Sequence, residues 1–280
     1  MAEAYRDRRQ GPLNINIEAV LDQRLGEKAR RIPRRLIRWT ERLICQDRLN
    51  EMLEVAYPRR GAGFCDAVLE HLGITVNVEG EANLPESRRV IIASNHPLGG
   101  LDGMALISIF TRIYGEGVKF VVNDLLNAVE PLSEVFLPVN KHGSQSRAAI
   151  RAIDDAMAGD GPVLVFPAGL CSRRRNGRVA DPEWNKMFVN MARRYHRDIV
   201  PVHFVGENSA RFYRTAQWRK RLGIRFNIEM ALLPSEVFRA EGKTFTVVCG
   251  RPISWRSLGA DARAAADDIR RQVYNLKPTH

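Results

Sequence analysis

A histidine and an aspartate lie close together in the segment SNHPLGGLDGMA at residues 94–105. The apolar run VIIA before it predicts a strand that ends just ahead of His96, and a helix is expected to begin near Leu101. Functional sites of α/β proteins lie where strands end and helices begin. Histidine takes up a proton near neutral pH, and a neighbouring carboxylate fixes its tautomer and stabilises the imidazolium. The pattern therefore predicts a general base, His96, oriented by Asp102.

The same turn also has a purely structural interpretation. His96 would then cap the end of the strand, while Gly99 and Gly100 would serve only the backbone of the turn. Three segments farther along the chain favour a functional site. They are VFLPVNKHG at 135–143, VLVFPAGLCSRR at 163–174 and IVPVHFVG at 199–206.

Together the four segments resemble, in the same order, the motif blocks of the glycerolipid acyltransferases, the superfamily of the lysophosphatidic acid and glycerol-3-phosphate acyltransferases. NHPLGGLD is similar to the His-x-x-x-x-Asp signature, VLVFPAGLCSRR to the Phe-Pro-Glu-Gly block and IVPVHFVG to the Val-Pro-Val block. The first string resembles a hemolysin-like, ornithine-lipid-type bacterial branch. The resemblance implies an O-acyltransferase of membrane lipid biosynthesis, which moves a fatty acyl group from acyl-CoA or acyl-carrier protein to the hydroxyl of a lyso-lipid. It implies no metal and no prosthetic cofactor.

The spacing of the two chemical groups departs from the superfamily by one additional residue between His96 and Asp102. On a helix, one residue rotates a side chain by about 100°. A looped turn at Gly99 and Gly100, with dihedral angles open to glycine, would absorb the extra residue. We therefore expect the carboxylate still to reach the ring.

The third segment departs from the superfamily on the acceptor side. Ala168 replaces the usual glutamate, and Cys171 stands where arginine is usual. These departures slightly favour a lyso-amino-acid lipid, such as lyso-ornithine or lyso-glycine lipid, while lysophosphatidic acid stays open. The residues that the resemblance places at the substrates are Asn95, Gly99, Gly100, Lys141, Pro167, Gly169, Arg173 and Arg174. Alternatively, residues 173–178 form a basic loop in water.

The chain of 280 residues has 43 Lys and Arg against 32 Asp and Glu, a formal net charge of +11. This charge favours nucleic acid, anionic lipid or phosphorylated substrates as partners. The four cysteines lack the spacing and the neighbouring histidines of a zinc site. The motifs G-x-S-x-G, G-x-x-x-x-G-K-[ST] and G-x-G-x-x-G do not occur, which argues against a serine hydrolase of the elbow type and against the common nucleotide-binding loops.

A basic nucleic-acid-binding module is the alternative from a different functional class. Its net charge would contact phosphates, and Trp39, Phe212, Tyr213 and Trp218 would stack on bases. This alternative explains the net charge, but it does not explain why His96 and Asp102 occur together after a predicted strand. Neither zinc-finger spacing nor an RNA-recognition motif is present, so no nucleic acid is expected.

An arginine-rich segment, KARRIPRRLIRWTERL at 28–43, combines arginines with Leu36, Trp39 and Leu43. This composition suits an anionic membrane interface, and a second basic patch at 211–226 would serve the same surface. The alternative is a helix packed on the core by its apolar stripe. No apolar run of about 18 residues and no signal-peptide core occur. We therefore expect no transmembrane helix and a peripheral protein on the cytoplasmic face of the inner membrane.

The rest of the chain alternates β-branched runs with helical patterns, which predicts an α/β fold with a mixed central sheet flanked by helices, as in glycerol-3-phosphate acyltransferases. Residues 1–72 are expected to form a helical segment, with two helices separated near Pro33, and 73–280 the acyltransferase domain. Strands are predicted at 74–78, 90–95, 118–123, 134–140, 162–167, 198–205, 224–232 and 244–250, and helices at 65–72, 101–114, 144–158, 183–196, 209–221 and 258–274.

Overall fold

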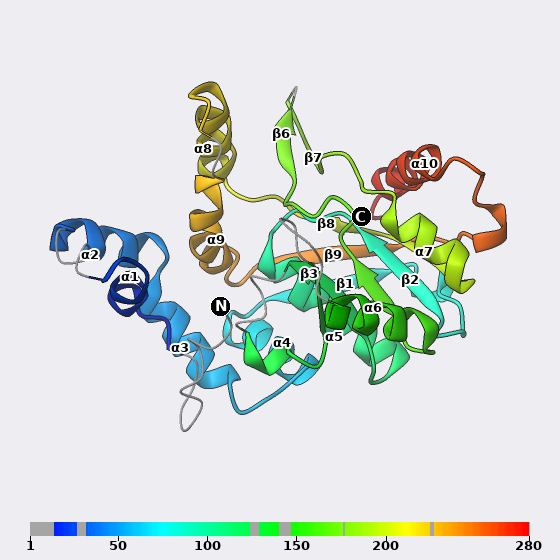
Figure 1. The fold of residues 1–280 in the computed structure, drawn as a ribbon, viewed down its shortest axis with the longest axis horizontal. Coiled ribbons are helices and arrows are strands. Elements are labelled where there is room, and N and C mark those ends of the chain that lie inside the picture. The colour runs from blue at the N-terminus through cyan, green and yellow to red at the C-terminus, as the bar shows by residue number, and fades with distance from the viewer. Residues whose placement is uncertain are drawn as a thin grey trace.

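The computed structural model describes residues 14–26, 32–123, 129–139, 147–175, 177–224 and 227–279. Its main sheet contains β1 Thr75–Glu79, β2 Val90–Ser94, β3 Lys119–Asn123, β4 Phe136–Val139, β5 Val163–Val165, β8 Asp198–Val205 and β9 Thr244–Cys249. The strand order is β1-β9-β8-β2-β5-β3-β4 (Figure 1). Within the described residues, every neighbouring pair in this sheet is parallel except β8 and β9. Each of these strands overlaps a predicted one.

The sheet is buried on both faces, and its central strand β2 shows this most clearly. All five residues of β2 are buried. Val90 and Ile92 pack into one core cluster, and Ile91 and Ala93 pack into another. Side chains of a strand alternate between the two faces, so the continuous apolar run of β2 indicates a strand covered on both sides.

Helices from different parts of the chain cover these two faces. One cluster contains the buried apolar side chains of α3 Gln46–Ala56, α4 Ala62–His71 and α5 Gly100–Tyr114. The other contains those of α6 Arg147–Ala158, α7 Met187–Tyr195 and α10 Ala262–Asn275. The predicted α/β fold class, a mixed central sheet flanked by helices, is confirmed.

Two further helices precede α3: α1 Ile17–Leu25 and α2 Arg34–Leu43. The prediction of two helices separated near Pro33 holds for α1 and α2. A separate helix, α3, follows α2, because Cys45 between them adopts a left-handed conformation with φ of 54°. Met52 and Leu53 of α3 belong to the core cluster of α4 and α5, so the predicted N-terminal segment and the α/β part share one core.

The region 224–232 corrects the sequence prediction. The expected strand is absent from its described part, where Ile228–Leu232 forms a 3₁₀ helix that runs into α9 Leu233–Arg239. The apolar residues there alternate as in a strand, but Glu229 is buried and Ile228 is 46% exposed, so the alternation does not match burial. Pro near the first turn of α9 also favours a helix start.

Residues 173–175 and 178 of the basic segment lie in strands, whereas the alternative expectation was a loop in water. The segment contributes to a two-stranded antiparallel hairpin of β6 Arg173–Arg175 and β7 Arg178–Ala180. The sequence between them, Asn-Gly, is typical of two-residue hairpin turns. Beside this hairpin stands α8 Ala210–Arg221 (Figure 1).

Candidate active site

His96 and Asp102 are in contact at the end of β2. His96 follows this strand closely, and Asp102 lies in the first turn of α5. The distance from Nδ1 of His96 to Oδ2 of Asp102 is 3.0 Å. The carboxylate is fully buried and also accepts hydrogen bonds from the backbone N–H groups of Leu98, at 2.8 Å, and Gly103, at 2.9 Å. With Nδ1–H donating to the carboxylate, Nε2 keeps its lone pair and can accept a proton.

Gly99 makes this contact compatible with the longer spacing. Its φ of 92° and ψ of −100° form the looped turn before α5, a conformation that residues with a side chain rarely adopt. A Cβ at this position would also lie 2.9 Å from both terminal methyl groups of Leu233. Gly100 is the first residue of the helix, and the space around its Cβ position is open. The turn accommodates the extra residue, as expected, and Asp102 still contacts His96. Of the two glycines, Gly99 supplies the unusual dihedral angles.

The His96 ring is held in a narrow, mostly buried position. It stacks on Phe166, with ring centroids 4.0 Å apart and planes inclined by 21°, and its side chain is 16% exposed. Burial on its own lowers the pKa of the imidazole, but the negative charge of Asp102, the neighbouring Cys171 and the hydrogen bond from the ring to Asp102 outweigh burial. The pKa of His96 is therefore held well above its ordinary value of 6.5.

The backbone of His96 is fixed by a second buried carboxylate, Asp181. Its Oδ1 accepts hydrogen bonds from the His96 backbone N–H at 3.2 Å and from the Ser172 hydroxyl at 2.6 Å, and its Oδ2 accepts from the Trp184 indole at 2.9 Å. The N–H of Ser172 donates to the His96 carbonyl at 2.7 Å. Burial raises the pKa of Asp181, and these hydrogen bonds oppose that rise. Sequence reasoning missed Asp181, because it lies 85 positions from His96 and acts through the backbone.

Asn95, predicted to bind substrate, is engaged within the fold. Its Nδ2 donates to the Phe204 carbonyl at 2.9 Å, and its Oδ1 accepts from the Phe204 N–H at 2.7 Å. The side chain thus ties the end of β2 to β8 and anchors the loop that carries His96. Pro167 and Gly169 shape the turn after β5: the Pro167 carbonyl accepts from Asn185 at 2.9 Å, and Gly169 has a φ of 60°.

Arg173, predicted to bind the acceptor anion, is paired within the fold. Its Nη2 lies 2.9 Å from Oε1 of Glu229, its Nη1 donates to the Cys171 carbonyl at 2.8 Å, and its side chain is 12% exposed. Nε of Arg219 lies 2.8 Å from the other oxygen of the same buried carboxylate. A buried carboxylate needs such partners, so Arg173 neutralises Glu229.

Arg174 is more exposed than Arg173, at 39%. Its Nη2 lies 3.3 Å from Glu207, and its guanidinium lies 5.2 Å over the Tyr213 ring. Lys141, the other predicted anion-binding residue, lies outside the described residues. Within the described ranges, no group of three or more His, Cys, Asp or Glu side chains is arranged to hold a metal ion.

Comparison with known proteins decides the family. The family profile described as Acyltransferase matches residues 19–279, nearly the whole chain. The chain belongs to this acyltransferase family. It is 40% identical over 264 residues to a "Lyso-glycine lipid O-acyltransferase" of Phocaeicola vulgatus, covering 94% of this chain and 95% of that protein. A protein of the same name in Bacteroides thetaiotaomicron is 38% identical over 264 residues, with 94% and 97% covered.

Among solved structures, the acyltransferase is similar to the 1-acyl-sn-glycerophosphate acyltransferase PlsC of Thermotoga maritima. The TM-score is 0.45 at 15% sequence identity, and the match covers 78% of this chain and 83% of that one. The resemblance to the glycerolipid acyltransferase superfamily, first drawn from four short segments, is confirmed by the family match and the curated relatives. The chain is an enzyme that transfers acyl groups.

Replacing Asp181 with asparagine tests whether this carboxylate holds the loop that carries His96 in place. Both oxygens of Asp181 accept hydrogen bonds, whereas asparagine has only one side-chain oxygen. Its NH₂ group would face a donor, either the Trp184 indole or the Ser172 hydroxyl and the His96 N–H. An unpaired buried polar group of this kind costs about 1–3 kcal/mol. We expect the free energy of unfolding to fall by about that amount and kcat to fall while the KM values change little. Chemical denaturation and steady-state kinetics measure the two effects.

The double variant with Trp184→Phe is the control for this prediction. It removes the indole donor that faces the new amide, so it should recover part of the lost kcat. A kcat unchanged by Asp181→Asn would show that this carboxylate serves the fold alone.

Proposed function

We propose that this acyltransferase esterifies the free hydroxyl of a lyso-lipid, and that its acceptor is a lyso-amino-acid lipid of the lyso-glycine type. The contact between His96 and Asp102 at 3.0 Å carries the proposal for the reaction, because it presents a base with its orienting carboxylate. The name of the two relatives, lyso-glycine lipid O-acyltransferase, supports this acceptor. The acyl donor is an acyl thioester, of acyl-CoA or of acyl-carrier protein.

The proposed step uses one base and no metal or prosthetic group. The hydroxyl oxygen of the acceptor attacks the carbonyl carbon of the thioester, and Nε2 of His96 takes the hydroxyl proton. The C–S bond then breaks, and the departing thiolate takes this proton from the imidazolium, which restores the base. Asp102 stabilises the imidazolium between these two events. Its negative charge raises the pKa of His96, which is the same stabilisation of the protonated ring.

The acceptor headgroup is the finer part of the proposal. A glycine lipid ends in a carboxylate and lysophosphatidic acid in a phosphate, and arginine binds both with two parallel hydrogen bonds. Arg173, one of the predicted anion ligands, is already paired with the buried carboxylate of Glu229. This supports an acceptor of lower charge, and Arg174 is the described candidate for binding its carboxylate.

Competition between acceptors tests the headgroup. The purified enzyme would receive lyso-glycine lipid, lyso-ornithine lipid and lysophosphatidic acid in one vesicle preparation, with products followed by mass spectrometry. We expect the amino-acid lipids to have the higher kcat/KM. Preference for the phosphate acceptor by about tenfold or more, a difference of about 1.4 kcal/mol, would overturn the headgroup assignment and leave the reaction standing.

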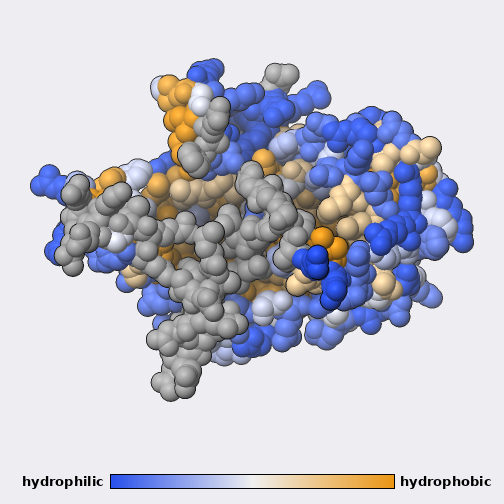
Figure 2. All heavy atoms as spheres, viewed as in Figure 1, coloured by the Kyte–Doolittle hydropathy of each residue, from blue (hydrophilic) through white to orange (hydrophobic). Residues whose placement is uncertain are grey.

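The enzyme is further proposed to act as a peripheral protein at the cytoplasmic face of the inner membrane. No described helix has the length and apolar character needed to cross a bilayer. Helix α2 has no buried residue, and it exposes Leu36 by 51% and Trp39 by 57% among its arginines. Apolar surface also gathers over α8 in Figure 2, where Leu222 at its end is 65% exposed. Basic helices with exposed apolar side chains suit a membrane interface.

Substituting glutamate for Arg34, Arg35 and Arg38 is expected to weaken binding to anionic vesicles. All three are exposed on α2, and each basic residue near such a surface contributes about 1 kcal/mol. Vesicle co-sedimentation measures the loss, and activity on a soluble short-chain acceptor is the control and should persist. Unchanged binding would leave α2 with a packing role only. A parallel titration with an oligonucleotide tests the nucleic-acid alternative.

A further inference from the structure

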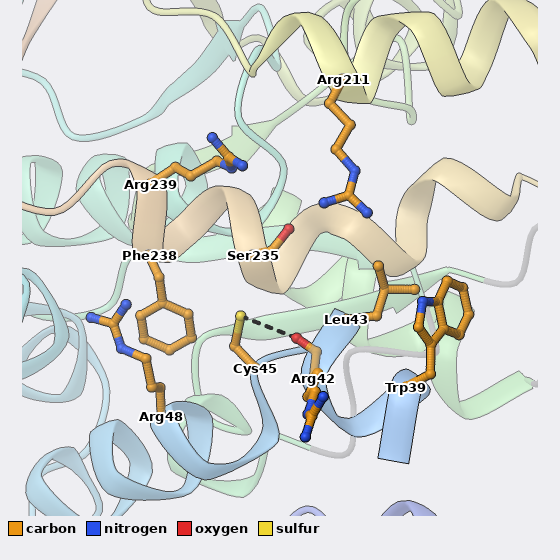
Figure 3. A pocket seen from close by; sticks show the side chains of 9 residues that line it. All are labelled: Trp39, Arg42, Leu43, Cys45, Arg48, Arg211, Ser235, Phe238 and Arg239. Carbon is orange, nitrogen blue, oxygen red and sulfur yellow. Dashed lines mark hydrogen bonds between the residues drawn. The ribbon is translucent and has the colours of Figure 1, made fainter. Parts of the chain in front are cut away.

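A basic pocket lies away from the His96 loop, between the N-terminal helices and helices α8 and α9. Its volume is about 410 Å³. Four of its nine lining residues are arginines and none is acidic: Arg42, Arg48, Arg211 and Arg239. They belong to α2, α3, α8 and α9, respectively. Figure 3 shows Arg211 extending from α8 toward Ser235 of α9, and Arg48 beside Phe238. None of the lining residues belongs to the loop from His96 to Asp102.

The turn between α2 and α3 forms one side of this pocket. Cys45, in its left-handed conformation, reverses the chain so that the last turn of α2 and the first turn of α3 border the same space. Arg42 and Arg48 come from these two turns. The Arg48 guanidinium lies 4.3 Å over the Phe238 ring, which holds it against α9.

The positive charge of the pocket is only partly neutralised. Arg48 pairs with Glu241 at 2.7 Å, and Nε of Arg239 lies 4.0 Å from Glu236. Among the residues that the structure describes, Arg42 and Arg211 have no side-chain hydrogen bond or ion pair. Two guanidinium groups are therefore free to bind an anion in a pocket without an acidic wall.

We infer that this pocket binds a single phosphate group, separately from the site of acyl transfer. Guanidinium groups bind phosphate oxygens with two parallel hydrogen bonds, and several arginines around one space match its charge. Trp39 and Leu43 add an apolar border to the same pocket. The phosphate of an anionic lipid would contact the arginines, and its apolar chain would contact Trp39 and Leu43. Free phosphate would contact the arginines alone.

The test uses the full-length protein with the His96→Ala substitution as the parent, so that binding is measured without turnover. Isothermal titration with inorganic phosphate and with glycerol phosphate gives the affinity for the free group. Titration with phosphatidylcholine vesicles, with and without phosphatidylglycerol, gives the affinity for the headgroup. Saturable binding of inorganic phosphate or glycerol phosphate supports the site. Vesicle binding identifies a lipid headgroup as the source where a soluble phosphate competes with it, because α2 is itself proposed to bind anionic vesicles. Because Trp39 lines the pocket, tryptophan fluorescence should change on binding, and the change should be reduced in Trp39→Phe.

Arg211→Ala is the decisive variant, and Arg221→Ala is its matched control. Both arginines lie on α8 and both are exposed, but only Arg211 lines the pocket. We expect Arg211→Ala to weaken phosphate affinity by about tenfold or more, as for loss of a charge-assisted hydrogen bond. For inorganic phosphate, Arg221→Ala should change the affinity by less than about twofold, since an exposed charge outside the pocket acts on a soluble ion only through screened attraction. The two variants are compared with soluble phosphate alone, because residues 211–226 belong to the proposed membrane surface.

Two results would overturn the inference. Equal losses in Arg211→Ala and Arg221→Ala would show a general attraction of the basic surface instead of a site. Absence of saturable binding by every phosphate probe, with the melting temperature unchanged from wild type, would show that the pocket takes no phosphate. Neither result depends on whether the enzyme transfers acyl groups to glycine lipids.

Discussion

Acyl transfer should fall by about 10²- to 10⁴-fold when His96 is replaced by alanine, the range that a general base contributes. The ring is the described group at the end of β2 that can take a proton near neutral pH, and Asp102 fixes its Nδ1. Without the ring, the acceptor hydroxyl must attack before losing its proton. Steady-state formation of the esterified lipid, followed by mass spectrometry, measures the loss.

The same substitution should leave the fold intact. His96 contributes a stacked contact with Phe166, while its backbone keeps the hydrogen bonds from Ser172 and to Asp181. Melting temperature and far-UV circular dichroism check this point. His71→Ala is the matched control, because that histidine is exposed on α4. A rate within about threefold of wild type, less than 1 kcal/mol in the barrier, would show that another group acts as the base.

The strands of the main sheet and the reacting pair could be predicted because local sequence determines them. The run Val90–Ser94 is apolar throughout, as a strand buried on both faces must be, and the Pro and Gly residues after it mark where it ends. The left-handed turn at Gly99 needs a glycine, so the sequence itself indicates how the longer spacing is absorbed.

The residues that the sequence could not place depend on distant partners. Arg173 has the residue type of an anion ligand, but Glu229, 56 positions later, is buried against it. The alternation of apolar residues at 224–232 favours a strand locally. The burial of Glu229 between Arg173 and Arg219, together with the helix start of α9, determines another structure. Such long-range pairing has no signal in a single sequence.

The Asp102→Asn variant should lose nearly as much activity as His96→Ala, and its pH profile should move to lower pH. The carboxylate selects the productive tautomer of His96, and asparagine selects it poorly, at up to about 10⁴-fold in kcat for comparable pairs. The pH shift has a definite sign. In the wild type, the pKa of His96 is held above 6.5, so the fraction with a neutral base, and with it kcat/KM, increases with pH above that value.

In Asp102→Asn, the charge that raises the pKa of His96 is gone while the burial that lowers it remains, so the ascending limb of kcat/KM should shift below its wild-type position. The groups near the ring from other elements, Cys171 and Asp181, are unchanged in this variant and do not cancel the shift. Asp160→Asn, which neutralises a carboxylate whose side chain is 90% exposed, is the control and should keep the wild-type profile. If the limb stays in place while the rate falls, the titrating group is not His96, and Asp102 acts on the position of the loop through Leu98 and Gly103 instead.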